Sequence, residues 1–171
     1  MTTIDYRDCD RQIWEEELAD FVPSRMLDAH IHLYWSTDFK ELPPEKFRRV
    51  EDMEALNQAS QVLYPDRKMQ YLILGYPNPG IVPERNIESN RANIADYAGV
   101  RHNRLVTPDC KLEDIERDMQ NPQFIGLKPY RTYSVTGDIH ECRIHEFLTH
   151  EQLELANEHG WWVTMHLSRV D

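Results

Sequence analysis

The chain has 171 residues, 40% of them hydrophobic, and its 30 acidic and 19 basic residues give a formal net charge of -11. This length and apolar content suit a folded domain with a real core and argue against wholesale disorder. The acidic balance argues against nucleic acid and anionic membrane surfaces as partners, because both would repel the chain. The longest apolar run, around Tyr71 to Tyr76, is far shorter than the ~20 residues of a membrane span.

The N-terminus and the cysteines both favour a cytoplasmic protein. The first residues lack the basic start and the apolar core of a secretory signal. Cys9, Cys110 and Cys142 lie far apart and form no CxxC pair, so we expect free thiols in a reducing compartment. We therefore expect a cytoplasmic protein with a small-molecule substrate.

Short runs of β-forming residues alternate along the chain with longer stretches of helical character. We expect an opening helix at about residues 10–20. Strands are then expected at about 25–34, 70–76, 104–107, 124–130 and 161–167, and the intervening helices at about 45–63, 89–98, 112–120 and 146–158. This alternation is typical of βα units and predicts an α/β fold with a parallel sheet.

Five strands and four connecting helices match the first part of a (β/α)8 TIM barrel, which has a typical length of about 250 residues. We divide the chain into an N-terminal helical segment, residues 1–23, and a partial barrel, residues 24–171. The partial barrel contains the first five βα units and is truncated after the fifth strand. Doubly wound sheets have the same alternation, so the strand count alone does not select a barrel.

The strongest local motif is Asp28-Ala29-His30-Ile31-His32, near the end of the first expected strand. Alternation along a strand predicts that Asp28, His30 and His32 share one face. The other face, which we expect to pack on helices, carries Leu27, Ala29, Ile31 and Leu33. Two imidazoles two residues apart can reach one metal ion, and imidazole suits zinc and similar ions. The alternative is a pair of hydrogen-bonded histidines at a strand end without a metal.

Three later side chains are candidates for the same site. His166 lies at the C-terminal end of the fifth expected strand, which is the end that carries the chemistry in (β/α)8 barrels. Lys128 and Tyr130 share a face of the fourth strand. Lys128 would bind a substrate carboxylate, ligate metal as a carbamate, or extend its ammonium into solvent. Trp35, just after the histidine pair, would line a substrate pocket or pack in the core.

The other histidines are expected outside the site. His102 falls in an expected loop, and His159 lies next to the helix-ending Gly160. Surface positions are expected for His140, His145 and His150.

An ordered set of motifs resembles the amidohydrolase-related family, in the branch that includes aminocarboxymuconate-semialdehyde decarboxylase. The set comprises the stretch from Trp14 to Tyr34 with its Asp-Ala-His-Ile-His motif, Asn90 followed by Asn103 to Pro108, Ile125 to Lys128, and Ala156 to Gly160 followed by Val163 to His166. The resemblance extends from about residue 12 to residue 169. It implies a (β/α)8 barrel with one divalent metal, usually zinc, and the ligands His30, His32 and His166.

The resemblance also implies a metal-dependent hydrolase that acts on an amide, ester or lactone bond of a small carboxylated substrate. Lys128, Trp35 and Tyr130 are expected to contact this substrate, and Asp28 is expected to support the ligands. Family members also use a histidine of the sixth strand and an aspartate of the eighth, so the catalytic residues are expected beyond Asp171.

Two alternatives remain open at this stage. The same metal ligands suit a non-oxidative decarboxylase of an aromatic or enoic acid. The chain is otherwise a catalytically incomplete fragment, or a partial-barrel subunit that forms a homo-oligomer, because an open parallel sheet exposes an unpaired edge strand.

Overall fold

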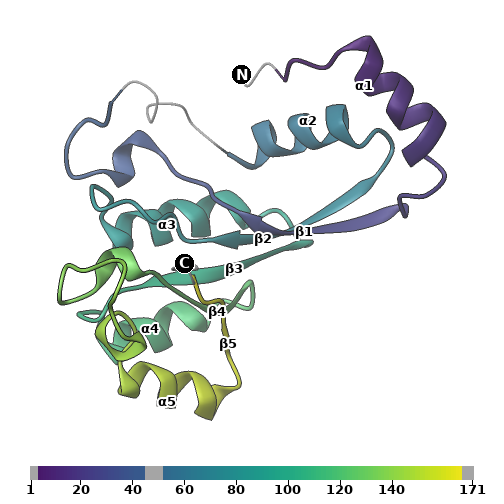
Figure 1. Ribbon diagram of the computed structural model, residues 1–171. Coiled ribbons are helices and arrows are strands. Elements are labelled where there is room, and N and C mark those ends of the chain that lie inside the picture. The colour runs from purple at the N-terminus through teal and green to yellow at the C-terminus, as the bar shows by residue number, and fades with distance from the viewer. Residues whose placement is uncertain (1–3, 45–51, 167–171) are drawn as a thin grey trace.

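The computed structural model describes residues 4–44 and 52–166, and its centre is a parallel sheet with the strand order β1-β2-β3-β4-β5 (Figure 1). The strands are β1 (Arg25–Ile31), β2 (Lys68–Leu74), β3 (Val100–Val106), β4 (Phe124–Pro129) and β5 (Trp162–Val163). The helices that connect them in turn are α2 (Met53–Leu63), α3 (Pro83–Ile94), α4 (Leu112–Met119) and α5 (His150–His159). The expected α/β class is confirmed, and the sheet curls as a half-barrel.

The N-terminal segment forms a helix that lies beside the end of α2 (Figure 1), where Trp14 contacts Tyr64 with ring centroids 6.1 Å apart. Helix α1 (Asp8–Ile13) continues into a π-helical turn, Trp14–Leu18, so the helix begins slightly earlier than expected. Arg67, which directly precedes β2, binds this segment. Its guanidinium lies 4.9 Å from the Trp14 ring centroid and donates to the carbonyl oxygens of Val22, at 3.2 Å, and Ala19.

Several boundaries differ from the expected ones because local capping overrides hydrophobic periodicity. Helix α3 begins at Pro83, which suits a first helical turn, instead of at residue 89. Helix α5 begins after Thr149, whose hydroxyl accepts the Gln152 backbone N–H at 3.2 Å. Strand β5 pairs over two residues only. Residues 45–51 of the expected helix 45–63 and Leu167 of the expected fifth strand lie outside the described residues.

The core lies between the sheet and its connecting helices. Tyr71 of β2 points to this side, where its hydroxyl donates to Ser60 of α2 at 2.8 Å. On the opposite, concave side, large apolar side chains remain open to solvent: Leu27 is 62% exposed and Trp162 is 71% exposed. Parallel pairing places Trp162 in register with Gly126, on the concave face of the sheet.

A register shift in β1 corrects the expectation that Asp28 shares a face with His30 and His32. Asp28 pairs with Tyr71 and Ile31 pairs with Ile73, so β1 has one more residue than β2 between these pairs. Side chains in register point the same way, which places Asp28 on the helix side with Tyr71. Alternation along β1 then places Leu27 on the concave side, and its exposure contradicts the expectation that it packs on helices.

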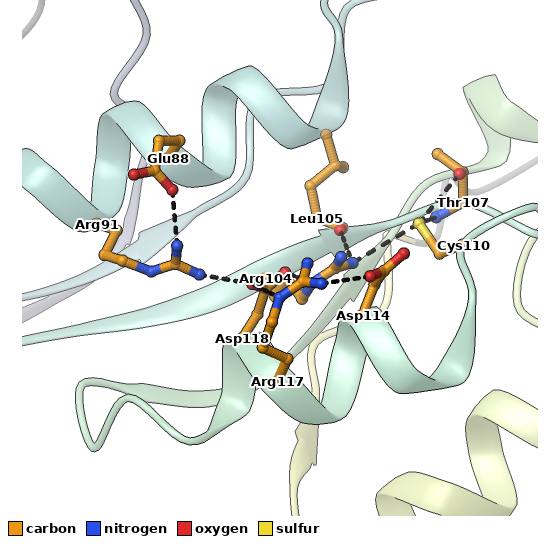
Figure 2. A network of polar contacts seen from close by, with 9 residues as sticks. All are labelled: Glu88, Arg91, Arg104, Leu105, Thr107, Cys110, Asp114, Arg117 and Asp118. Atoms are coloured by element: carbon orange, nitrogen blue, oxygen red, sulfur yellow. Dashed lines mark hydrogen bonds and ion pairs between the residues drawn. The ribbon is translucent and has the colours of Figure 1, made fainter.

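A polar network joins α3 and α4 to the helix side of β3 (Figure 2). Arg104 is 1% exposed, and its Nε donates to Asp118 at 2.9 Å. Arg91 of α3 donates to the other oxygen of the same carboxylate at 2.6 Å. Arg104 also donates to the Leu105 carbonyl oxygen at 2.9 Å and contacts the Cys110 sulfur at 3.6 Å. The network therefore satisfies a buried arginine and ties two helices to one strand.

Candidate functional site

The two histidines of the HxH motif lie side by side at the carboxyl end of β1. Their ring centroids are 5.1 Å apart, with the ring planes at 83°. The His32 Nδ1 lies 2.9 Å from the carbonyl oxygen of Leu74 in β2. A carbonyl can only accept, so Nδ1 carries the proton and the Nε2 lone pair of the neutral ring stays available to a metal ion.

The surroundings of His32 keep its imidazole neutral. Burial lowers its pKa, and the positive charges of His30 and Lys128 lower it further, whereas the hydrogen bond to Leu74 acts in the opposite direction. Only the neutral ring presents a lone pair to a metal, so this environment favours ligation. His30 is more exposed to solvent than His32.

Asp28 supports the histidine pair through the backbone instead of through a histidine ring. Its Oδ1 accepts the backbone N–H of His30 at 3.0 Å, within the bulged stretch of β1. The carboxylate therefore stabilises the irregular backbone that separates Asp28 from the two histidines.

Lys128 lies on the concave face of β4 and is almost fully buried, with 1% exposure. Its Nζ lies 4.8 Å from the Tyr130 ring centroid, and burial lowers the pKa of this ammonium. No carboxylate forms an ion pair with Lys128 among residues 4–44 and 52–166. The site therefore holds a buried cation that lacks a counter-ion from the described part of the chain.

Tyr130 lies close to both His32 and His166. Its ring centroid is 6.4 Å from that of His32 and 5.3 Å from that of His166. Its hydroxyl donates to the Gly75 carbonyl oxygen at 2.8 Å, and burial raises its pKa. Tyr130 is only 1% exposed, so its hydroxyl is committed to the backbone after β2 and its ring forms part of the surroundings of both histidines.

His166 is the outermost of the three expected ligands and is exposed. Partial burial lowers its pKa, as do the positive charges of Lys128, His30 and Arg131. The structure thus brings His30 and His32 together, and the Tyr130 ring lies near both His32 and His166. Within the described ranges, no group of three His, Cys, Asp or Glu side chains is close enough to hold a metal ion.

A buried network that the sequence did not predict fixes the chain just after His32. Asp38 is fully buried and accepts from the Trp35 backbone at 3.1 Å, from Asn86 at 2.9 Å and from Ser89 at 2.6 Å. Asn86 also donates to the Leu33 carbonyl oxygen at 3.1 Å. The sequence contains one signal for this network, because Asn86 and Ser89 are polar residues three positions apart and so lie on the same face of a helix.

Trp35 is half-buried and packs against the apolar core. His102 does not lie in a loop, because it belongs to β3 and is fully buried. His145 and His150 stack on one another, with centroids 6.1 Å apart, and within the described residues neither ring contacts His30 or His32.

Comparison of the chain with protein-family models, with curated proteins and with solved structures gives no match. In the described part of the chain, every helix is too short or too polar to cross a membrane.

Proposed function

We propose that the chain is a metal-dependent hydrolase of the amidohydrolase type, which acts on an amide, ester or lactone bond of a small carboxylated substrate. The observation that carries this proposal is the His30–His32 pair, with the Nδ1 of His32 committed to the Leu74 carbonyl and Nε2 left for a ligand. This arrangement fits a divalent ion, most often zinc, because hydrogen bonding at one ring nitrogen orients the other toward metal.

His30 and His32 would hold the ion, with His166 as the third ligand. A bound divalent ion supplies Lewis-acid activation of water and of the bond to be cleaved. Among the described residues no three His, Cys, Asp or Glu side chains are close enough to hold a metal ion, so ligation by all three histidines requires these side chains to move closer together.

Lys128 is the residue that we assign to the substrate carboxylate. It is buried on the same concave face, has no carboxylate partner among the described residues, and its Nζ lies 4.8 Å from the Tyr130 ring centroid. A substrate carboxylate would supply the missing counter-charge to this buried side chain, and a charge pair there is stronger than in bulk water.

Metal binding is the first test. We expect isothermal titration with Zn2+ or Co2+ to give one ion per wild-type chain, and His30→Ala and His32→Ala each to abolish it. His145→Ala is the matched control, because this exposed histidine stacks on His150 and has no ring contact with the HxH pair among the described residues. Equal binding by wild type and His32→Ala would contradict the assignment.

Substrate chemistry is tested separately. Metal-loaded chain is incubated with a carboxylated ester and with an aromatic carboxylic acid, and acid release and carbon dioxide release are both followed. Hydrolysis with a KM that rises in Lys128→Met would support the proposal. Carbon dioxide release without hydrolysis would instead support the decarboxylase alternative.

A further inference from the structure

Strand β5, which leads to His166, is held by few backbone contacts. Only Trp162 and Val163 pair with β4, and the Thr164 backbone N–H donates to the Leu127 carbonyl oxygen at 3.0 Å. Beyond Thr164, neither Met165 nor His166 forms a hydrogen bond with the described residues. Thr164 is therefore the last point at which this segment is anchored before the histidine.

A side-chain bond reinforces that anchor across an intervening strand. The Asn103 side-chain N–H of β3 donates to the Thr164 hydroxyl at 2.6 Å, although β4 lies between β3 and β5. Asn103 is fully buried, and its Oδ1 has no partner among the described residues. The bond to Thr164 is therefore the one hydrogen bond that the Asn103 side chain makes with the described residues.

Gly126 leaves room for the Asn103–Thr164 hydrogen bond to pass over β4. It is in register with Asn103 on one side and with Trp162 on the other. A Cβ at this position would lie 2.9 Å from Asn103 Oδ1 and 2.8 Å from the Trp162 Cβ, and it would collide with the Trp162 carbonyl oxygen. Only a residue without a side chain leaves room for the bond to pass over β4.

We propose that Asn103 is a positioning residue for His166, which it orders through the Thr164 hydroxyl across Gly126. Thr164 and His166 are two residues apart in an extended segment, so fixing the first restricts the direction of the second. This role goes beyond the proposed function, because the ordering of His166 needs no bound metal. The Asn103–Thr164 hydrogen bond would reduce the conformational entropy that the exposed His166 imidazole loses when it binds a metal ion.

The experiment that decides the proposal is carried out without a metal ion. Backbone 15N relaxation is measured at His166 in wild type, Thr164→Val and Thr164→Ser. Valine keeps the shape of threonine but removes the hydroxyl, whereas serine keeps the hydroxyl. We expect the order parameter to fall toward ~0.6 or below in Thr164→Val and to stay near the wild-type value in Thr164→Ser.

Asn103→Ala should reproduce the Thr164→Val result, and Thr37→Val, an exposed position near the other edge of the sheet, should leave His166 unchanged. Circular dichroism establishes that each variant is folded, and Thr164→Val decides the outcome if Asn103→Ala does not fold. An unchanged order parameter in folded Thr164→Val would overturn the proposal.

Measurements of Co2+ binding then test the positioning role of Asn103 separately from the proposed metal-binding function. If the chain binds Co2+, Thr164→Val should weaken affinity by about 10-fold, the range found when a supporting hydrogen bond is removed. In a His166→Ala background the same change should have no further effect, as a double-mutant cycle would show. Absence of Co2+ binding by wild type would count against the proposed function and leave the relaxation result intact.

Discussion

His102 allows a quantitative test of how this core holds a polar group. Its ring is fully buried and packs against Phe124 with centroids 4.6 Å apart. Neither ring nitrogen has a hydrogen-bond partner among the described residues. Burial, aided by the positive charges of Arg104 and Arg91, lowers the pKa of His102 to about 3. The folded chain therefore keeps this ring neutral where an unfolded chain would protonate it.

The free energy of unfolding must consequently decrease as the pH falls. Above a pH of about 6.5, the ordinary pKa of histidine, neither state binds this proton. Between that pH and about 3, the unfolded state binds one more proton than the folded state. Each pH unit then removes about 1.4 kcal/mol of stability, or about 2.7 kcal/mol between pH 6.5 and pH 4.5.

Urea unfolding followed by tryptophan fluorescence measures this loss in wild type and His102→Phe at pH 7.5 and pH 4.5. Phenylalanine keeps a ring against Phe124 and cannot titrate. Because the packing difference is the same at both pH values, it cancels when the two are compared. We expect His102→Phe to lose about 2–3 kcal/mol less than wild type on acidification.

His140→Gln serves as the control, since the exposed His140 side chain is solvated in both states. It should follow the wild-type pH dependence. Parallel pH dependences for wild type and His102→Phe would refute the assignment of His102 as a buried neutral histidine.

Three further substitutions test the packing around the sheet, each by chemical denaturation. Gly126→Ala should lower stability by about 1–3 kcal/mol, because its Cβ collides with β5, while Gly99→Ala, with its nearest neighbour atom at 3.5 Å, should be tolerated. Asp118→Asn should cost about 3–5 kcal/mol by leaving the buried Arg104 without its counter-charge, and a loss below 1 kcal/mol would contradict a buried pair. Thr149→Ala should cost about 1 kcal/mol through loss of the α5 cap, and Thr149→Ser should recover it.

Local signals in the sequence were sufficient for the order of the elements. The alternation of β-forming runs with helical stretches predicted five strands, four connecting helices and a parallel sheet, all of which the structure contains. These features depend on periodicity and on residues such as Pro and Gly, which act over a few positions. The HxH motif also predicted a close pair of histidines, because extended backbone places alternate side chains on one face.

Tertiary contacts decided the features that local periodicity cannot encode. The pairing of β1 with β2 places Asp28 on the helix side, because the register of two strands depends on residues about 40 positions apart. The Asp38 network brings together groups that are 48 and 51 positions apart, and the Tyr130 ring lies near both His32 and His166. The sequence by itself determined which elements form and in which order. Only the packed structure decided which side chains meet, because strand register and burial depend on contacts between distant segments.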